Sequence, residues 1–145
     1  MRFIGFDRED EAIEWAKSVI GVKVAGLCRA LSCVDASGRF AMVVVLSNFS
    51  PLNIDVHVAS PTGRKWATPK GFIEIFNAVF HYIFDQLGAV RATALIKSTN
   101  IRARQFVEHL QFKLEGVMRK SFETDDLCIY GLLDSEFYAH PWRRV

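Results

Sequence analysis

The feature that most constrains this fold is the run from residue 54 to residue 96. A strand pattern, a basic turn, a long apolar helix and a second strand pattern follow one another there. The helix pattern extends from Pro69 to about Leu87 and is apolar around most of its circumference, so it must pack against a sheet. Gly88 then ends the helix, and the second strand occupies 90–96. A strand, a helix and a strand in this order predict a right-handed crossover between parallel strands.

The first of these strands, at 54–59, has two different faces. Ile54, Val56 and Val58 point one way, and this apolar face belongs to the core. Asp55 and His57 stand on the opposite face and present a carboxylate and an imidazole to whatever lies above them. Both groups are candidates for acid–base chemistry.

The turn that follows the strand has the features of an anion site. Thr68 is suited to cap the helix and Pro69 to begin it, because Pro lacks the N–H that would otherwise remain unpaired. The free N–H groups and the positive end of the helix dipole would lie close to Arg64, Lys65 and Lys70. A phosphate-bearing ligand could therefore bind at this turn.

The rest of the chain fits the same single domain, residues 1–145. Its predicted elements are a helix at 7–20, strands at 24–34 and 39–47 around a turn at 35–38, a helix at 100–110, and strands at 112–118 and 127–133. The last two strands should form an antiparallel hairpin around an acidic turn.

Composition limits the class of protein. Half of the 145 residues are hydrophobic and 23% are charged, as in an ordinary globular domain. No apolar run reaches the ~18 residues of a membrane span, and the first residues lack a signal peptide's apolar segment. Three cysteines (Cys28, Cys33 and Cys128) cannot all pair, which favours a reducing compartment and a cytoplasmic location. The four histidines show no metal-ligand spacing.

The net charge of +2 does not indicate general affinity for nucleic acid. The positive charge is nevertheless concentrated, because residues 64–104 hold seven Lys or Arg and two acids. Nucleic-acid binding through this surface is a less favoured alternative, which predicts a steep salt dependence.

Three stretches of the second half carry a family resemblance. They are Asn100-x-x-Ala103 at the start of a helix, Phe112-Lys113-Leu114-Glu115-Gly116-Val117-Met118-Arg119, and Tyr130-Gly131-Leu132-Leu133 after an acidic turn. They resemble the GCN5-related N-acetyltransferase (GNAT) superfamily. Within it, the likeness is closest to the branch that includes the ribosomal-protein N-terminal acetyltransferases. The resemblance is clearest over residues 54–133.

This resemblance implies an α/β (α+β) fold whose mixed central sheet is flanked by helices and splayed open between the strands at 54–59 and 90–96. Acetyl-CoA would lie in the split as the acetyl donor, without a metal. The residues implied in its binding are Val58, Ser60, Arg64, Lys65, Trp66, Ala67, Thr68, Asn100, Ala103 and Arg104. Asn100 could equally serve as the helix N-cap.

The implied activity is direct transfer of an acetyl group to a primary amine of a protein N-terminus, a lysine or a small molecule. His57 and Asp55 are the candidate bases, and Tyr130 is a candidate proton donor. Four positions depart from the family. Val107 takes the place of a Tyr that many members use as general acid, and Gln111 takes the place of a Gly before Phe112. Ala67 and Pro69 take the Gly and the Gly or Ala places of the phosphate turn. A non-catalytic binding or structural protein is therefore the alternative, and a homodimer is a possible assembly.

Overall fold

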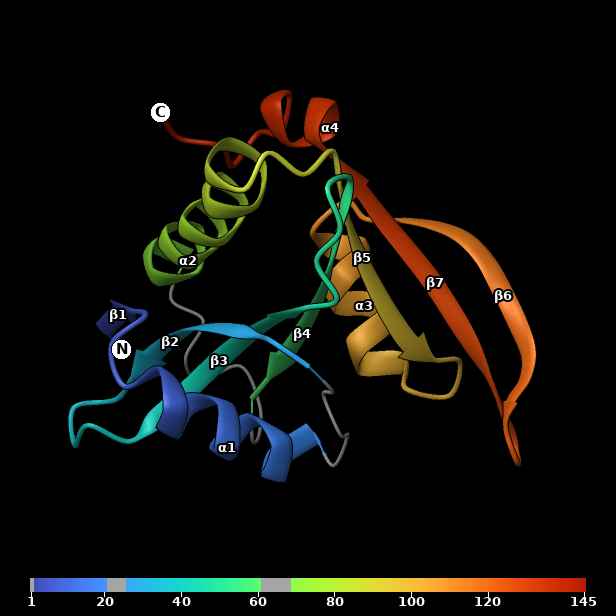
Figure 1. The fold of residues 1–145 in the computed structure, drawn as a ribbon, viewed down its shortest axis with the longest axis horizontal. Helices are drawn as coiled ribbons and strands as arrows, with labels where there is room; N and C mark the ends of the chain where they lie inside the picture. Colours follow the sequence, from blue (N-terminus) through green and yellow to red (C-terminus); the bar gives the residue numbers. More distant parts are fainter. Residues whose placement is uncertain (1, 21–25, 61–68) are drawn as a thin grey trace.

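The computed structural model describes residues 2–20, 26–60 and 69–145, which form a seven-stranded sheet with helices on both faces (Figure 1). Residues 21–25 and the turn residues 61–68 lie outside the described residues. The elements are β1 (Arg2–Gly5), α1 (Glu9–Ile20), β2 (Arg29–Val34), β3 (Phe40–Ser47), β4 (Asn53–Ala59), α2 (Pro69–His81), η1 (Tyr82–Gln86), β5 (Arg91–Lys97), α3 (Ile101–His109), β6 (Lys113–Phe122), β7 (Asp125–Leu133) and α4 (Asp134–Tyr138).

The strand order is β1-β2-β3-β4-β5-β7-β6, and β4 and β5 run parallel where every other described neighbour pair is antiparallel. The parallel pair confirms the predicted crossover through the long helix. The predicted hairpin of the last two strands is also confirmed, although both strands are longer than their apolar patterns indicated.

Two hydrophobic cores lie on opposite faces of the sheet. The larger core joins α2 to the apolar side chains of the central strands, with Ile54 and Val56 among them. The smaller core packs Ala12 and Ala16 of α1 against β2, β3 and β4. The small side chains of α1 allow a close approach of helix to sheet. Each face of β4 therefore packs against one of the two cores. The predicted alternation of its side chains between the two faces of the sheet is confirmed.

The sheet is splayed between β4 and β5. The parallel ladder between these strands has three residue pairs and ends where Asp55 faces Thr93. Beyond that point β4 continues beside β3 as far as Ala59, and β5 continues beside β7 as far as Lys97. The two halves of the sheet thus diverge from a closed end, as predicted for these two strands (Figure 1).

Polar side chains link the strands at this closed end. Thr93 donates its hydroxyl hydrogen to Oδ1 of Asn53 (2.5 Å) and accepts a hydrogen bond from Nε of Arg91 (3.1 Å). Arg91 also forms an ion pair with Glu115 of β6 (2.5 Å). A Cβ added at Gly131 would lie 2.5 Å from Glu115 and 2.7 Å from Arg91, so a larger residue there would displace the ion pair.

The long helix spans the predicted range, but its last turn is wider than an α-helix. Residues 82–86 form a π-helical turn, in which the N–H of Leu87 bonds the carbonyl of Tyr82 (2.9 Å). Gly88 follows with a φ of +72°, a left-handed conformation that glycine adopts without strain. The prediction that Gly88 ends this helix is confirmed.

Two short elements were not predicted, because β1 and α4 have only four and five residues and show no clear period. The C-terminal tail packs against α2. Trp142 contacts the rings of Phe72 and Phe76, and Asn77 of α2 bonds the backbone of Trp142 and Arg144.

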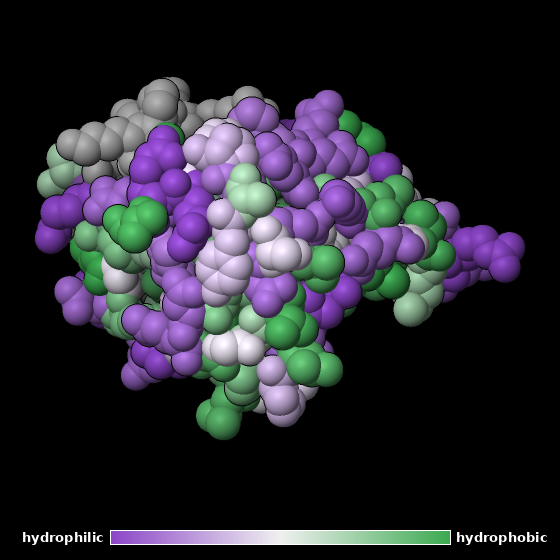
Figure 2. Space-filling view, turned by 90° about the horizontal axis from the view of Figure 1, so that it is seen from above, coloured by the Kyte–Doolittle hydropathy of each residue, from purple (hydrophilic) through white to green (hydrophobic). Residues whose placement is uncertain are grey.

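The edge strand β6 is exposed along most of its length. Figure 2 shows apolar side chains among polar ones at the right-hand end of the molecule, where β6 lies in Figure 1. The exposed large apolar residues of this strand are Leu114, Val117, Met118 and Phe122. Charged neighbours such as Arg119 and Lys120 disfavour the addition of a further strand at this edge. In the described ranges, no helix is both long and apolar enough to cross a membrane.

Candidate active site

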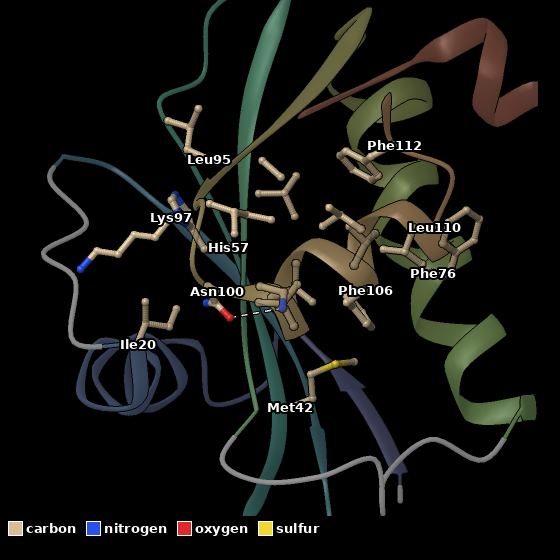
Figure 3. A pocket seen from close by; sticks show the side chains of 18 of the residues that line it. Ile20, Met42, His57, Phe76, Leu95, Lys97, Asn100, Phe106, Leu110 and Phe112 are labelled. Atoms are coloured by element: carbon tan, nitrogen blue, oxygen red, sulfur yellow. Dashed lines mark hydrogen bonds between the residues drawn. The ribbon is translucent and has the colours of Figure 1, made fainter. Parts of the chain in front are cut away.

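A cavity of about 640 Å³ lies where the sheet is splayed (Figure 3). Apolar side chains of α2 and α3 form much of its wall, among them Phe72, Phe76, Ala103, Phe106 and Val107. In Figure 3, Ile20, His57, Leu95 and Lys97 lie at one end, and Phe76, Leu110 and Phe112 at the other.

The cavity passes between the strands. Its lining residues on β4 and β5 come from both faces of each strand, namely Val56, His57, Val58, Ala94, Leu95, Ile96 and Lys97. Consecutive residues of a strand point to opposite faces, so a cavity that touches all of them must open through the gap between the strands. Such a gap gives two ligands access to one point from opposite sides of the sheet.

His57 is the titratable base at this gap. Its Nε2 lies 3.0 Å from Oγ of Ser47 on the neighbouring strand, which holds the ring in place. Burial lowers the pKa of His57, and the charge of nearby Asp55 partly opposes this effect. The imidazole is therefore neutral at physiological pH and keeps a nitrogen lone pair that can accept a proton. His57 lines the cavity, and its role as a catalytic base stays a prediction.

Asp55 is not brought to the cavity wall. Its carboxylate accepts hydrogen bonds from Nδ2 of Asn48 (3.2 Å) and Nδ2 of Asn53 (3.1 Å), and its residue is 9% exposed. Asp55 pairs with Thr93 at the last rung of the β4–β5 ladder. These contacts assign it to the closed end of the sheet, where it links β3 and β4.

Tyr130 and Arg104 are also outside the cavity lining. The hydroxyl of Tyr130 donates to Glu108 (2.8 Å) and accepts from Nε of Arg104 (3.1 Å), and the whole residue is buried. Burial is the main reason that the pKa of Tyr130 is raised. Arg104 also donates to the carbonyl of Ser98 (3.0 Å). These bonds fasten α3 to β5 and β7, and they hold both side chains away from the cavity.

Of the expected residues at the start of and on helix α3, Asn100 and Ala103 line the cavity and Arg104 does not. Asn100 lines the wall and also caps the helix, since its Oδ1 accepts the N–H of Ala103 (3.3 Å). Val107 lines the wall as well. The position that the family resemblance assigns to a general acid therefore faces the cavity, but its side chain cannot donate a proton.

The cofactor-binding predictions fall into two groups. Arg64, Lys65, Trp66, Ala67 and Thr68 lie outside the described residues. Val58 lines the cavity, and Ser60 follows the end of β4 with a buried Oγ that has no hydrogen-bond partner among the residues described.

The edge of β4 fits the acyl donor that the resemblance implies. From Val56 to Ala59 this edge has no strand opposite it among the described residues, because β5 has diverged. Backbone groups on such an edge are available to a ligand. They suit an extended chain of amides such as pantetheine, whereas Ser60 is not among the lining residues of the cavity.

Sequence reasoning missed several lining residues. Leu95 and Lys97 alternate with Ala94 and Ile96 on β5, and the strand period alone would have placed them on the opposite face to the core. Phe122 was not identified because β6 extends beyond its apolar pattern.

Neither a family model nor a curated protein matches this sequence. Solved structures do match its fold. A spermidine/spermine N-acetyltransferase, SpeG of Vibrio cholerae in mutant form, gives a TM-score of 0.63 at 18% identity, over 90% of this chain and 79% of that one. A GNAT-family acetyltransferase of Bacillus anthracis gives 0.59 at 16% identity, over 74% and 67%.

Both the splayed β4–β5 pair and these matches identify the architecture. The chain has the GNAT fold. At these identities the likeness concerns the fold alone, and nothing in it singles out the ribosomal-protein branch, which stays a prediction. The cavity lies at the divergence of β4 and β5, the position that the family resemblance implied.

Proposed function

We propose that this protein is an acetyl-CoA-dependent N-acetyltransferase that transfers an acetyl group directly to a primary amine. The observation that carries the proposal is the cavity through the splayed sheet, which has a neutral imidazole at one end. A route through the sheet allows donor and acceptor to meet from opposite faces. The structural matches, a spermidine/spermine N-acetyltransferase and a GNAT-family acetyltransferase, support the same reaction class.

Acetyl-CoA supplies the acetyl group as an activated thioester. We assign its pantetheine part to the free edge of β4 near Val58 and Ser60. Its phosphates are assigned to the turn that contains Arg64 and Lys65, before the start of α2 at Pro69. Asn100 and Ala103 line the opposite wall of the same cavity.

His57 acts as the base in this proposal. A lysine-like amine with a pKa near ~10.4 costs roughly 4–5 kcal/mol to deprotonate at pH 7, whereas an α-amine near ~8 costs about 1–1.5 kcal/mol. The amine nitrogen forms the amide bond as the C–S bond breaks, and His57 receives the proton that the nitrogen loses, directly or through a water. The departing sulfur carries the electron pair away as a thiolate and is later protonated.

The leaving group does not require a dedicated acid. A thiol with a pKa near ~8.5 is a tolerable leaving group at neutral pH. Val107 cannot donate a proton, and Tyr130 is bonded to Glu108 and Arg104 outside the cavity lining. We therefore propose that the thiolate leaves without a proton from either residue.

The first test is calorimetric titration with acetyl-CoA, with desulfo-CoA and ATP as controls. Replacing Arg64 and Lys65 together with Ala should weaken binding at least tenfold, since the two charges that we assign to the phosphates are lost. The matched control replaces Arg119 and Lys120 of β6, an adjacent basic pair on an exposed strand outside the cavity lining. Equal loss in both variants, or no binding by the wild type, would refute the proposed donor site.

The second test is His57→Gln, which keeps the approximate size of the ring and loses its titration. We expect kcat to fall by roughly 10²–10⁴-fold with acetyl-CoA affinity unchanged. In the wild type, kcat/KM should fall as the pH drops through the lowered pKa of His57. A variant with wild-type turnover would remove His57 from the mechanism.

One observation favours a second candidate, a GNAT-fold protein that binds acetyl-CoA without turnover. Val107 occupies the cavity wall where many family members carry a catalytic Tyr. Acetyl-CoA binding without transfer to any amine would favour this candidate, and failure to bind would indicate a structural role. The cytoplasmic location and the homodimer stay predictions.

A further inference from the structure

The acceptor amine must lie near the proposed base, so its end of the cavity is the one that holds His57 (Figure 3). Ile20, Leu95 and Lys97 also lie at this end, and the first two give it apolar surface (Figure 3). Leu127 pairs with Lys97 across the β5–β7 ladder, and Phe122 lies under the ammonium group of Lys97, 4.6 Å from Nζ to the ring centroid. Leu95 is 40% exposed and Phe122 is 37% exposed, which leaves apolar surface available at the opening.

Among the described residues that line the cavity, Lys97 is the only one with a Lys, Arg, Asp or Glu side chain. No Asp or Glu belongs to that described lining. The described lining of the cavity therefore offers a positive charge to an acceptor and no carboxylate for a cationic one.

The neighbouring carboxylates on the β6–β7 hairpin are held by other groups or lie outside the lining. Asp125 accepts hydrogen bonds from the hydroxyls of Ser98 and Thr99, which lower its pKa to about 2. Asp126 accepts the backbone N–H of Lys120. Glu123 is exposed at the hairpin tip and is not part of the cavity wall.

We infer that the acceptor is a monoamine on an apolar body that also carries a negative charge, and that polyamines are poor acceptors. This inference rests on the proposed acetyl transfer. The apolar body contacts Leu95, Phe122 and Leu127, and the negative group pairs with Lys97. A second ammonium group, as in spermidine, would meet Lys97 and lose hydration without gaining a carboxylate partner. This protein thus differs in acceptor class from the polyamine acetyltransferases that share its fold.

The experiment compares three acceptors by kcat/KM with saturating acetyl-CoA. L-Phenylalanine and phenethylamine share the amine and the aryl group and differ in the carboxylate, and spermidine is the polycation. They are assayed with the wild type and with Lys97→Met, which keeps the length of the side chain and removes its charge. The control is Lys113→Met, whose side chain is 74% exposed on β6 and pairs with Glu136 away from the cavity.

We expect the wild type to prefer phenylalanine to phenethylamine and to use spermidine at least tenfold less well than either. In Lys97→Met, the phenylalanine-to-phenethylamine ratio should fall by about tenfold, while the control keeps the wild-type ratio. The two amines differ in pKa, but this difference affects the ratio equally in the wild type and in Lys97→Met. A change in the ratio between the two proteins therefore does not arise from it.

Three outcomes would overturn the inference. A preference for spermidine, or a ratio that Lys97→Met leaves unchanged, would refute the acceptor class while acetyl transfer stands. Transfer to none of the three amines would also refute it. The acetyl-CoA titration then shows whether the proposed function fails as well, since it does not depend on the acceptor.

Discussion

Asp55→Ala is expected to destabilise the protein rather than to act on catalysis alone. The carboxylate is almost fully buried and accepts two hydrogen bonds, from Asn48 (3.2 Å) and Asn53 (3.1 Å). A hydrogen bond to a charged group contributes about 1.5–3 kcal/mol, and these two are rather long, so we take the lower value for each. The expected loss is about 3 kcal/mol, because both amides are left without this acceptor.

Urea unfolding at neutral pH, followed by circular dichroism, measures this loss directly. For a chain of this length, 3 kcal/mol corresponds to a Tm about 8–12 °C lower. Asp55→Asn keeps one acceptor oxygen and should lose about half as much. The control is Asp10→Ala on the exposed side of α1, which should change stability by less than about 0.5 kcal/mol.

Asp55→Ala should also change the affinity for acetyl-CoA. Below the unfolding transition, folded Asp55→Ala should bind acetyl-CoA less tightly, because the angle between the two halves of the sheet depends on the closed end. If instead the stability of Asp55→Ala equals that of the control while turnover collapses, Asp55 is a catalytic group and its assignment to the closed end is wrong.

The remaining predictions concern the tail and acid stability. Asn77→Ala removes hydrogen bonds to the backbone of Trp142 (2.8 Å) and Arg144 (2.6 Å), so we expect a loss of about 1–3 kcal/mol in urea unfolding, and a change below 0.5 kcal/mol would contradict the role of this contact. Burial lowers the pKa values of His57 and His140, so the unfolded chain binds more protons than the folded one as the pH falls through about 6.5. The free energy of unfolding should therefore decrease between pH 7.5 and 5.5. The decrease should be smaller in His140→Gln, and an equal decrease in that variant would show that His140 does not contribute.

Much of the architecture could be predicted because its elements are long and strongly patterned. The apolar helix after residue 69, the parallel crossover and the final hairpin follow from periodicity and from the order of elements. The splay between β4 and β5 could not be derived from periodicity, since the alternation of side chains along each strand does not depend on whether the neighbouring strand is paired with it. It was implied by the family resemblance alone.

The site was predicted less completely, because contacts between distant elements decide it. The sequence pattern places Tyr130 on a strand and says nothing of its partners. Only the fold shows that its hydroxyl forms hydrogen bonds with Arg104 and Glu108 of α3. Lys97 carries no motif, and it becomes a site residue because β5 leaves β4 before reaching it.

The contrast between Asp55 and His57 shows what the divergence of the strands does. The two residues stand on the same face of β4, separated by roughly 6–7 Å along the strand, and the sequence treats them alike as candidate bases. Asp55 sits on the last rung shared with β5, so its carboxylate is taken up by the side chains that hold the sheet together. His57 comes two residues later, where β5 has already turned away, and its ring reaches the cavity. The end of a three-pair ladder thus separates a structural carboxylate from a candidate catalytic imidazole.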